Sequence, residues 1–236
     1  GLASNRYADG GSMTTPYFKG EVHGTEKLYR PDGTLYCETP FVHDKEHGVE
    51  THTYTDGSVC KTTFSKGVKH GEQTLRLADG AGVVTPYANG KQHGLQKRTG
   101  PDGIRQETLW VEGKVQGQQK RTEADGTVTL TTYVNDKQTG PQKRTQPDGV
   151  VVESTWVDAK QTGPQRQVFP DGRVLESMWL DDKKHGPYKV TLPSGITSVT
   201  PYVHGLAHGM QVTTYSKGTV IETPWVRENL ARVYAK

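Results

Sequence analysis

An aromatic residue recurs along almost the whole chain at a spacing of 23 residues, with one first interval of 24. A Thr or Ser stands two positions before every one of these residues. Self-similarity at a fixed period of this length is typical of repeat proteins, in which each repeat contacts only its neighbours. The aromatic residues are Tyr17, Phe41, Phe64, Tyr87, Trp110, Tyr133, Trp156, Trp179, Tyr202 and Trp225.

Two further columns keep the same spacing. An Asp-Gly pair occurs once in each of seven repeats and becomes Ser194-Gly195 and Lys217-Gly218 in the last two. The pattern predicts a single repeat domain over residues 1–236, with nine repeats at 15–222 and partial units at 1–14 and 223–236. The second column consists of Gly24, Gly48, Gly71, Gly94, Gly117, Gly140, Gly163, Gly186 and Gly209.

One repeat, residues 81–103, shows the expected local structure. Residues 81–88 favour a strand, and Asn89-Gly90 is a strong hairpin signal because both positions tolerate positive φ. Residues 91–99 are predicted to be the return strand, and Gly-Pro-Asp-Gly at 100–103 turns the chain again. No segment has a sustained 3.6-residue apolar period. Short connections require antiparallel neighbours, so we expect an all-β, elongated, open meander of about 20 strands.

Composition agrees with a fold that needs little core. Only 31% of the residues are hydrophobic, and the mean hydropathy is −0.75. No apolar stretch is long enough for a transmembrane helix. The net charge of +3 is too small to indicate nucleic-acid binding. Two cysteines are too few for a disulfide scaffold and leave the redox compartment open.

One repeat contains the motif Tyr87-x-Asn89-Gly90-Lys91-x-His93-Gly94 and, eight residues further on, Asp102-Gly103. This motif resembles the MORN repeat, and most of all the bacterial variant linked to toxin–antitoxin and immunity loci. It differs from the eukaryotic pattern because Gln96, Gln119 and Gln142 stand where a second glycine is usual. The resemblance implies a bacterial protein of the periplasm or cytoplasm and an open sheet of hairpins that acts as a scaffold, and a fold by itself does not convey function.

Basic residues gather on the predicted return strands of the middle repeats. Successive side chains of a strand point to opposite faces, so we expect the Lys column and the Arg column to lie on opposite faces. One alternative is cross-strand pairing with Glu107, Glu153 and Glu176, and the other is contact with an acidic partner. The basic candidates for partner binding are Lys97, Arg98, Lys120, Arg121, Lys143, Arg144 and Arg166.

Tryptophans gather in the C-terminal half, and Trp110, Trp156 and Trp179 are the aromatic candidates for partner binding. The structural alternative is that each ring covers a neighbouring glycine and holds the strand register. The functional alternative is a binding face, because Trp and Tyr are favoured interface anchors.

A histidine precedes the repeat glycine in six repeats and is replaced by Gln116, Thr139 and Thr162 in the others. Equivalent positions lie two strands apart, about 9–10 Å, which is too far for one column to supply a zinc site. A role in the turn is therefore expected. The sequence contains no motif for catalysis, a cofactor or a metal, and a catalytic site needs a singular constellation that identical repeats do not provide. We therefore predict a protein that is not an enzyme and uses no cofactor.

The leading functional hypothesis is a module that binds a protein partner. The resemblance implies that the partner is a cognate toxin, neutralised by occlusion. The alternatives are a MORN scaffold that binds anionic lipid headgroups and an extended structural or adhesive element. We expect no nucleic-acid binding, and weak or no membrane binding, because 26 acids nearly balance 29 bases.

Two smaller expectations concern particular segments. Cys37 and Cys60 occupy equivalent positions in adjacent repeats, about 9–10 Å apart, and should therefore be free thiols. A charged edge strand is predicted over residues 230–235.

The predicted meander makes a prediction about particle shape. Twenty strands at about 4.8 Å give a length of roughly 95 Å before twist. Small-angle X-ray scattering should therefore show an elongated particle. A radius of gyration equal to that of a globular protein of this mass would contradict the open sheet.

Overall fold

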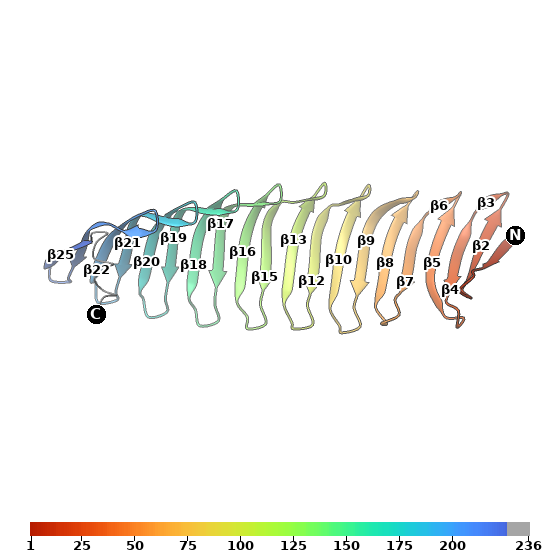
Figure 1. Cartoon of the computed structure of the whole chain (residues 1–236), viewed down its shortest axis with the longest axis horizontal. Helices are drawn as coiled ribbons and strands as arrows, with labels where there is room; N and C mark the ends of the chain where they lie inside the picture. Colours follow the sequence, from red (N-terminus) through yellow and green to blue (C-terminus); the bar gives the residue numbers. More distant parts are fainter. Residues whose placement is uncertain (226–236) are drawn as a thin grey trace. The chain divides into compact units, whose positions relative to one another are not determined.

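The computed structural model describes residues 1–225, which contain 25 β-strands and no helix. The chain divides into an N-terminal unit, Gly1–Gln116, and a C-terminal unit, Gly117–Lys236. Within each unit the strands form a single antiparallel layer, so the predicted all-β open meander is confirmed (Figure 1). Residues 1–225 accordingly hold no helix able to cross a membrane.

The strands follow one another in chain order within each unit. The N-terminal unit contains β1 (Leu2–Arg6), β2 (Ser12–Phe18), β3 (Glu21–Val22), β4 (Gly24–Tyr29), β5 (Leu35–Val42), β6 (Lys45–Glu46), β7 (Gly48–Thr53), β8 (Val59–Ser65), β9 (Val68–Arg76), β10 (Gly82–Ala88), β11 (Lys91–Gln92), β12 (Gly94–Thr99), β13 (Arg105–Val111) and β14 (Lys114–Val115). The C-terminal unit contains β15 (Gly117–Thr122), β16 (Val128–Val134), β17 (Lys137–Thr145), β18 (Val151–Val157), β19 (Lys160–Val168), β20 (Val174–Leu180), β21 (Lys183–Thr191), β22 (Thr197–Val203), β23 (Leu206–Ala207), β24 (Gly209–Thr214) and β25 (Val220–Trp225).

The return strand of a repeat is irregular, which the sequence did not predict. The continuous strand expected over 91–99 is broken at His93 into β11 and β12. The backbone N–H of His93 donates to the carbonyl of Pro86 at 2.9 Å, and Gly94 has φ of +115°. A local bulge of this kind explains the five two-residue strands β3, β6, β11, β14 and β23, and hence 25 strands instead of about 20.

The repeat glycine is required by its conformation and its surroundings. A Cβ on Gly94 would lie 2.9 Å from Cγ of Pro86, and its positive φ already disfavours any other residue. The strand register places Trp110 directly opposite Gly94, and Trp179 directly opposite Gly163. The register therefore pairs these rings with the repeat glycine, and the covering of each glycine by a ring stays a prediction.

The buried stripe of the sheet is polar. Within residues 1–225 the only buried hydrophobic residues are Cys37, Ala81 and Val150. The Thr or Ser two positions before the aromatic ring is buried in every repeat except the last, where Thr223 on β25 is exposed. This column consists of Thr15, Thr39, Thr62, Thr85, Thr108, Thr131, Ser154, Ser177 and Thr200.

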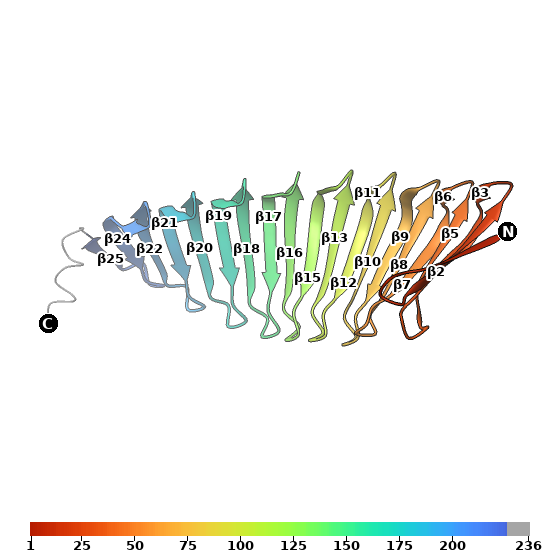
Figure 2. The same cartoon turned by 45° about the vertical axis from the view of Figure 1, so that its right-hand side comes forward.

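Two kinds of turn lie at opposite ends of the strands in each unit (Figure 2). The hairpin turn has two consecutive residues with positive φ, 50° at Asn89 and 81° at Gly90, as the sequence predicted. The C-terminal unit uses the same conformation at Asp158 and Ala159, with φ of 49° and 66°. A residue with a Cβ pays a steric cost there that glycine avoids.

Three further expectations have separate outcomes. Cys37 and Cys60 are free, and each lies opposite His52, so one strand separates them as predicted. The edge strand expected over residues 230–235 lies outside the described residues. The single repeat domain over 1–236 stays a prediction.

The positive φ of Ala159 generates a stability prediction. Ala159→Gly should raise the free energy of unfolding by about 0.5–1 kcal/mol, because relief of the left-handed strain exceeds the entropy that glycine adds to the unfolded chain. Urea denaturation followed by circular dichroism measures it. Gly113 occupies the equivalent position with φ of 81° and open space around its Cα. Gly113→Ala should therefore change stability in the opposite direction, and the same sign in both variants would contradict the strain argument.

Candidate partner-binding surfaces

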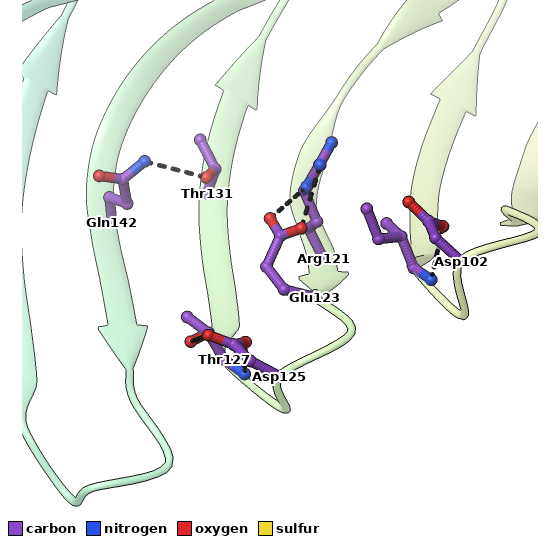
Figure 3. A network of polar contacts seen from close by, with 8 residues as sticks. Asp102, Arg121, Glu123, Asp125, Thr127, Thr131 and Gln142 are labelled. Atoms are coloured by element: carbon purple, nitrogen blue, oxygen red, sulfur yellow. Dashed lines mark hydrogen bonds and ion pairs between the residues drawn. The ribbon is translucent and has the colours of Figure 1, made fainter.

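One face of the sheet, here called the ring face, carries the aromatic, Thr/Ser and Gln columns. In the N-terminal unit, Gln96 Nε2 donates to Thr85 Oγ1 at 2.9 Å, and Trp110 Nε1 donates to Gln96 Oε1 at 3.4 Å. In the C-terminal unit, Gln142 Nε2 donates to Thr131 Oγ1 at 3.2 Å (Figure 3). These hydrogen bonds form a ladder that satisfies the buried hydroxyl groups.

The tryptophans proposed as binding anchors take part in this ladder. Trp156 Nε1 donates to Ser154 Oγ at 3.0 Å. Trp179 Nε1 lies 2.9 Å from both Gln165 Oε1 and Ser177 Oγ. Their indole N–H groups thus form hydrogen bonds with other side chains of the sheet, which supports the structural alternative for this column.

The opposite face is here called the proline face, because it carries prolines such as Pro141, Pro164 and Pro187. It also carries the Lys column and the Glu column. Lys143 Nζ lies 3.0 Å from Glu153 Oε1 on the next strand. Arg166 Nε lies 3.9 Å from Glu176 Oε1. The cross-strand pairing alternative is therefore confirmed at these two positions, and exposed pairs of this kind contribute about 0–1 kcal/mol each.

The predicted basic stripe is divided between the two faces. Lys97 lies directly opposite Glu107 on β13, and Lys120 lies opposite Leu130 on β16. The neighbouring arginines point the other way, as strand alternation predicts. Arg121, for example, pairs with Glu123 at 2.5 Å at the end of its strand (Figure 3). Arg98 and Arg144 occupy the equivalent positions in their repeats. The ten candidate residues therefore do not form one surface.

Two adjoining clefts lie on the proline face of the C-terminal unit. Their volumes are about 440 and 410 Å³, and Pro164 and Arg166 line both. The first cleft is also lined by Pro141, Lys143 and Glu153. The second is also lined by Glu176, Met178 and Pro187. Each cleft thus combines an apolar floor with paired charges.

Two exposed apolar side chains, which the sequence analysis did not identify, lie two positions after the cleft-lining residues Thr155 and Met178. Val157 and Leu180 follow the aromatic residue of their repeats and are 48% and 42% exposed. Strand alternation places both on the proline face. The signal was present in the sequence, because an apolar residue follows the aromatic residue in most repeats.

His47 and His93 of the histidine column have the expected role in the turns, whereas Nδ1 of His23 and of His185 is buried without a hydrogen-bond partner. His93 Nδ1 accepts a hydrogen bond from the backbone N–H of Glu112, in the next hairpin turn, at 3.5 Å. Where threonine replaces histidine, Thr139 Oγ1 accepts from the backbone N–H of Asp158 at 3.2 Å. The replacement therefore preserves an acceptor for the same turn position, which confirms the turn-associated role.

The Asp-Gly turns are closed by the aspartate side chain. Asp125 Oδ1 accepts from the backbone N–H of Thr127 at 2.8 Å, and Oδ2 accepts from Thr127 Oγ1 at 3.0 Å (Figure 3). These two hydrogen bonds lower the pKa of Asp125 below 3.8. The backbone and hydroxyl groups of Ser58 lower the pKa of Asp56 in the same way.

No family model and no curated protein sequence matches the chain. Among solved structures, it is similar to the TCP10 domain of Danio rerio CPAP in complex with a peptide of STIL, with 15% identity, 95% of this chain and 100% of that chain covered, and a TM-score of 0.46. It is also similar to the SAS-4 (dCPAP) TCP domain of Drosophila melanogaster in complex with a proline-rich motif of Ana2, with 13% identity, 75% and 90% covered, and a TM-score of 0.40. Similarity at this level does not identify a partner for this chain, and membership of the MORN family stays a prediction.

The Asp-Gly turns generate a prediction about pH. Because the folded-state pKa of Asp56 and Asp125 is lowered, their stabilising effect is present above the unfolded-state pKa and is lost as pH falls through the folded-state pKa. The urea midpoint should therefore decrease as pH falls from about 5 to about 2, and less steeply in the Asp56→Asn/Asp125→Asn double variant. Thr127→Val, which leaves the backbone hydrogen bond in place, should have an intermediate effect. An equal pH dependence in all three proteins would contradict the assignment.

Proposed function

We propose that this protein is a non-enzymatic repeat module that binds a protein partner with the proline face of its C-terminal unit. The observation that carries the proposal is the pair of clefts on this face, whose apolar lining includes Pro164 and Met178. Val157 and Leu180 extend the same face by one side chain beyond Thr155 and Met178 and are nearly half exposed. Contiguous exposed apolar surface rimmed by polar residues marks interaction sites in soluble proteins.

The charged side chains that line the second cleft favour a specific contact with a partner. Glu176 lies between Arg166 and Lys189, with Lys189 Nζ 3.6 Å from Glu176 Oε2. Alternating charges on a surface select partners with the complementary order and raise the association rate. The apolar floor supplies burial, and the ion pairs supply orientation. The ring face is less suited to binding, because its polar groups are bonded within the sheet.

The absence of an enzymatic role is part of the proposal. Imidazole, carboxyl and hydroxyl groups at the repeated positions, such as those of His93, Asp125 and Thr131, are used in turns and ladders. Catalysis requires a preorganised constellation that differs from its surroundings. The repeated arrangement instead offers a broad surface without a reactive centre.

The finer proposal is that the chain is a MORN-type antitoxin or immunity protein that neutralises a toxin by covering its active site. The sequence resemblance supports it, together with a surface wide enough for an occluding contact. The second candidate is a scaffold for anionic lipid. It is less favoured, because the carboxylates beside Lys143 and Arg166 reduce their attraction to anionic headgroups. A structural or adhesive element is the third.

The partner can be captured with a photo-reactive amino acid placed at Leu180. A discrete crosslinked protein, absent when the same group replaces ring-face Arg144, supports the proposal. Inhibition of that protein's toxic activity by the purified chain would support the antitoxin function. Flotation with anionic vesicles and no protein crosslink would instead favour the lipid scaffold.

Charge reversal tests the contact quantitatively. Lys120→Glu/Lys143→Glu/Arg166→Glu should weaken the captured complex by about tenfold or more, measured by titration calorimetry at low salt. The fold should persist, because exposed pairs contribute little stability. Lys27→Glu is the matched control, since Lys27 occupies the same column in the N-terminal unit and lies 3.1 Å from Glu38. Unchanged affinity in the triple variant would eliminate the Lys column as part of the interface.

A further inference from the structure

A cluster of rings interrupts the repeat pattern in the N-terminal unit. Arg30 and Tyr54 begin successive Asp-Gly turns, while Tyr36 lies on β5 and His52 on β7. The following repeat has Val59, Leu75 and Leu77 in place of Tyr36, His52 and Tyr54. The cluster is therefore not explained by the ladder that stabilises every repeat.

The four side chains hold one another in place. The ring centroids of His52 and Tyr54 are 4.5 Å apart. The rings of Tyr36 and His52 pack edge to face, with their centroids 5.5 Å apart. The Arg30 guanidinium lies 5.2 Å from the Tyr36 ring centroid. Its Nη2 donates to the carbonyl of Thr53, so the guanidinium plane is anchored to the next repeat. Mutual contacts of this kind preorganise a surface for binding.

These residues and Thr55 line a cleft of about 240 Å³. Tyr54 is 45% exposed, so the cleft is open to solvent on this side. The cleft thus presents aromatic faces and one guanidinium plane to a ligand. Such surfaces stack on flat groups and offer few hydrogen bonds to other ligands.

The charge of the cleft restricts the ligand. Aromatic rings attract cations, yet Arg30 already occupies the Tyr36 face and would repel a second cation. An aliphatic side chain would gain only burial of its apolar surface. An aromatic ring gains burial together with edge-to-face and guanidinium stacking, each favourable in this geometry. The chemistry therefore favours an aromatic ring over an aliphatic or cationic group.

We propose that this cleft binds an aromatic side chain of a partner protein. The site lies in the N-terminal unit and is separate from the proline face that carries the proposed function. The inference rests on the proposed function only in assuming that the aromatic ring belongs to a protein partner. A binding test with a free aromatic probe therefore succeeds or fails independently of the crosslinking and charge-reversal experiments.

The test is a nuclear magnetic resonance titration of the full chain with N-acetyl-tryptophanamide, whose ring current shifts nearby amide signals. We expect saturable shifts centred on residues 52–55. N-acetyl-leucinamide and N-acetyl-argininamide should give none. Tyr54→Leu, which keeps apolar bulk and removes the ring, should weaken probe binding by about tenfold. Tyr215→Ala is the control, because Tyr215 holds the equivalent turn position in the C-terminal unit.

Three results would show that the cleft does not bind an aromatic ring. They are no saturable shift up to the solubility limit of the probe, equal binding of the leucine or arginine probe, and unchanged binding in both Tyr54→Leu and His52→Leu. Free tryptophan that binds tenfold more tightly than the blocked probe would contradict a partner side chain as the source and indicate a free metabolite. Circular dichroism of each variant separates loss of the site from loss of the fold.

Discussion

The pairing of a left-handed glycine with an aromatic ring on the adjacent strand sets the register of the hairpins in both units. Gly94 lies opposite Trp110 in one unit and Gly163 opposite Trp179 in the other. The glycine leaves room for the side chain of Pro86 or Thr155 on the neighbouring strand, and its positive φ creates the bulge that ends the short return strand. A one-residue slip would turn every side chain to the other face, so this pairing also decides which columns become buried.

The consequence is a sheet whose buried stripe is made of hydroxyl groups. Burial of unbonded polar groups is costly, and the glutamine ladder removes that cost by giving Thr85 and Thr131 a donor. In the first repeats Glu26 replaces glutamine and accepts from Thr15. Directional hydrogen bonds fix the alignment of strands more sharply than apolar contacts do. A single layer with a sparse apolar core can therefore adopt one register.

The two faces of the sheet consequently have different roles. The ring face is occupied with internal hydrogen bonds, including those of Trp156 and Trp179. The proline face retains exposed apolar side chains, and on the same face the charges of Lys143 and Arg166 are paired but still accessible. Because the hydrogen bonds of the ring face recur from repeat to repeat, they stabilise the sheet. Because the side chains of the proline face also recur, they provide a broad contact surface. The cluster around His52 departs from the repeat, and a departure from regularity is where a specific ligand can be recognised.

The repeat length, both turn types, the all-β class and the placement of the Lys and Arg columns on opposite faces could be predicted from the sequence. These properties depend on local φ preferences and on alternation along a strand, as at Asn89-Gly90 and at Lys143-Arg144. Three features could be seen only in the tertiary structure: the break of the strand at His93, the ion pair of Lys143 with Glu153, and the contacts among Arg30, Tyr36 and His52. Those features depend on register between strands and on the meeting of residues from different repeats, which spacing along one chain does not specify.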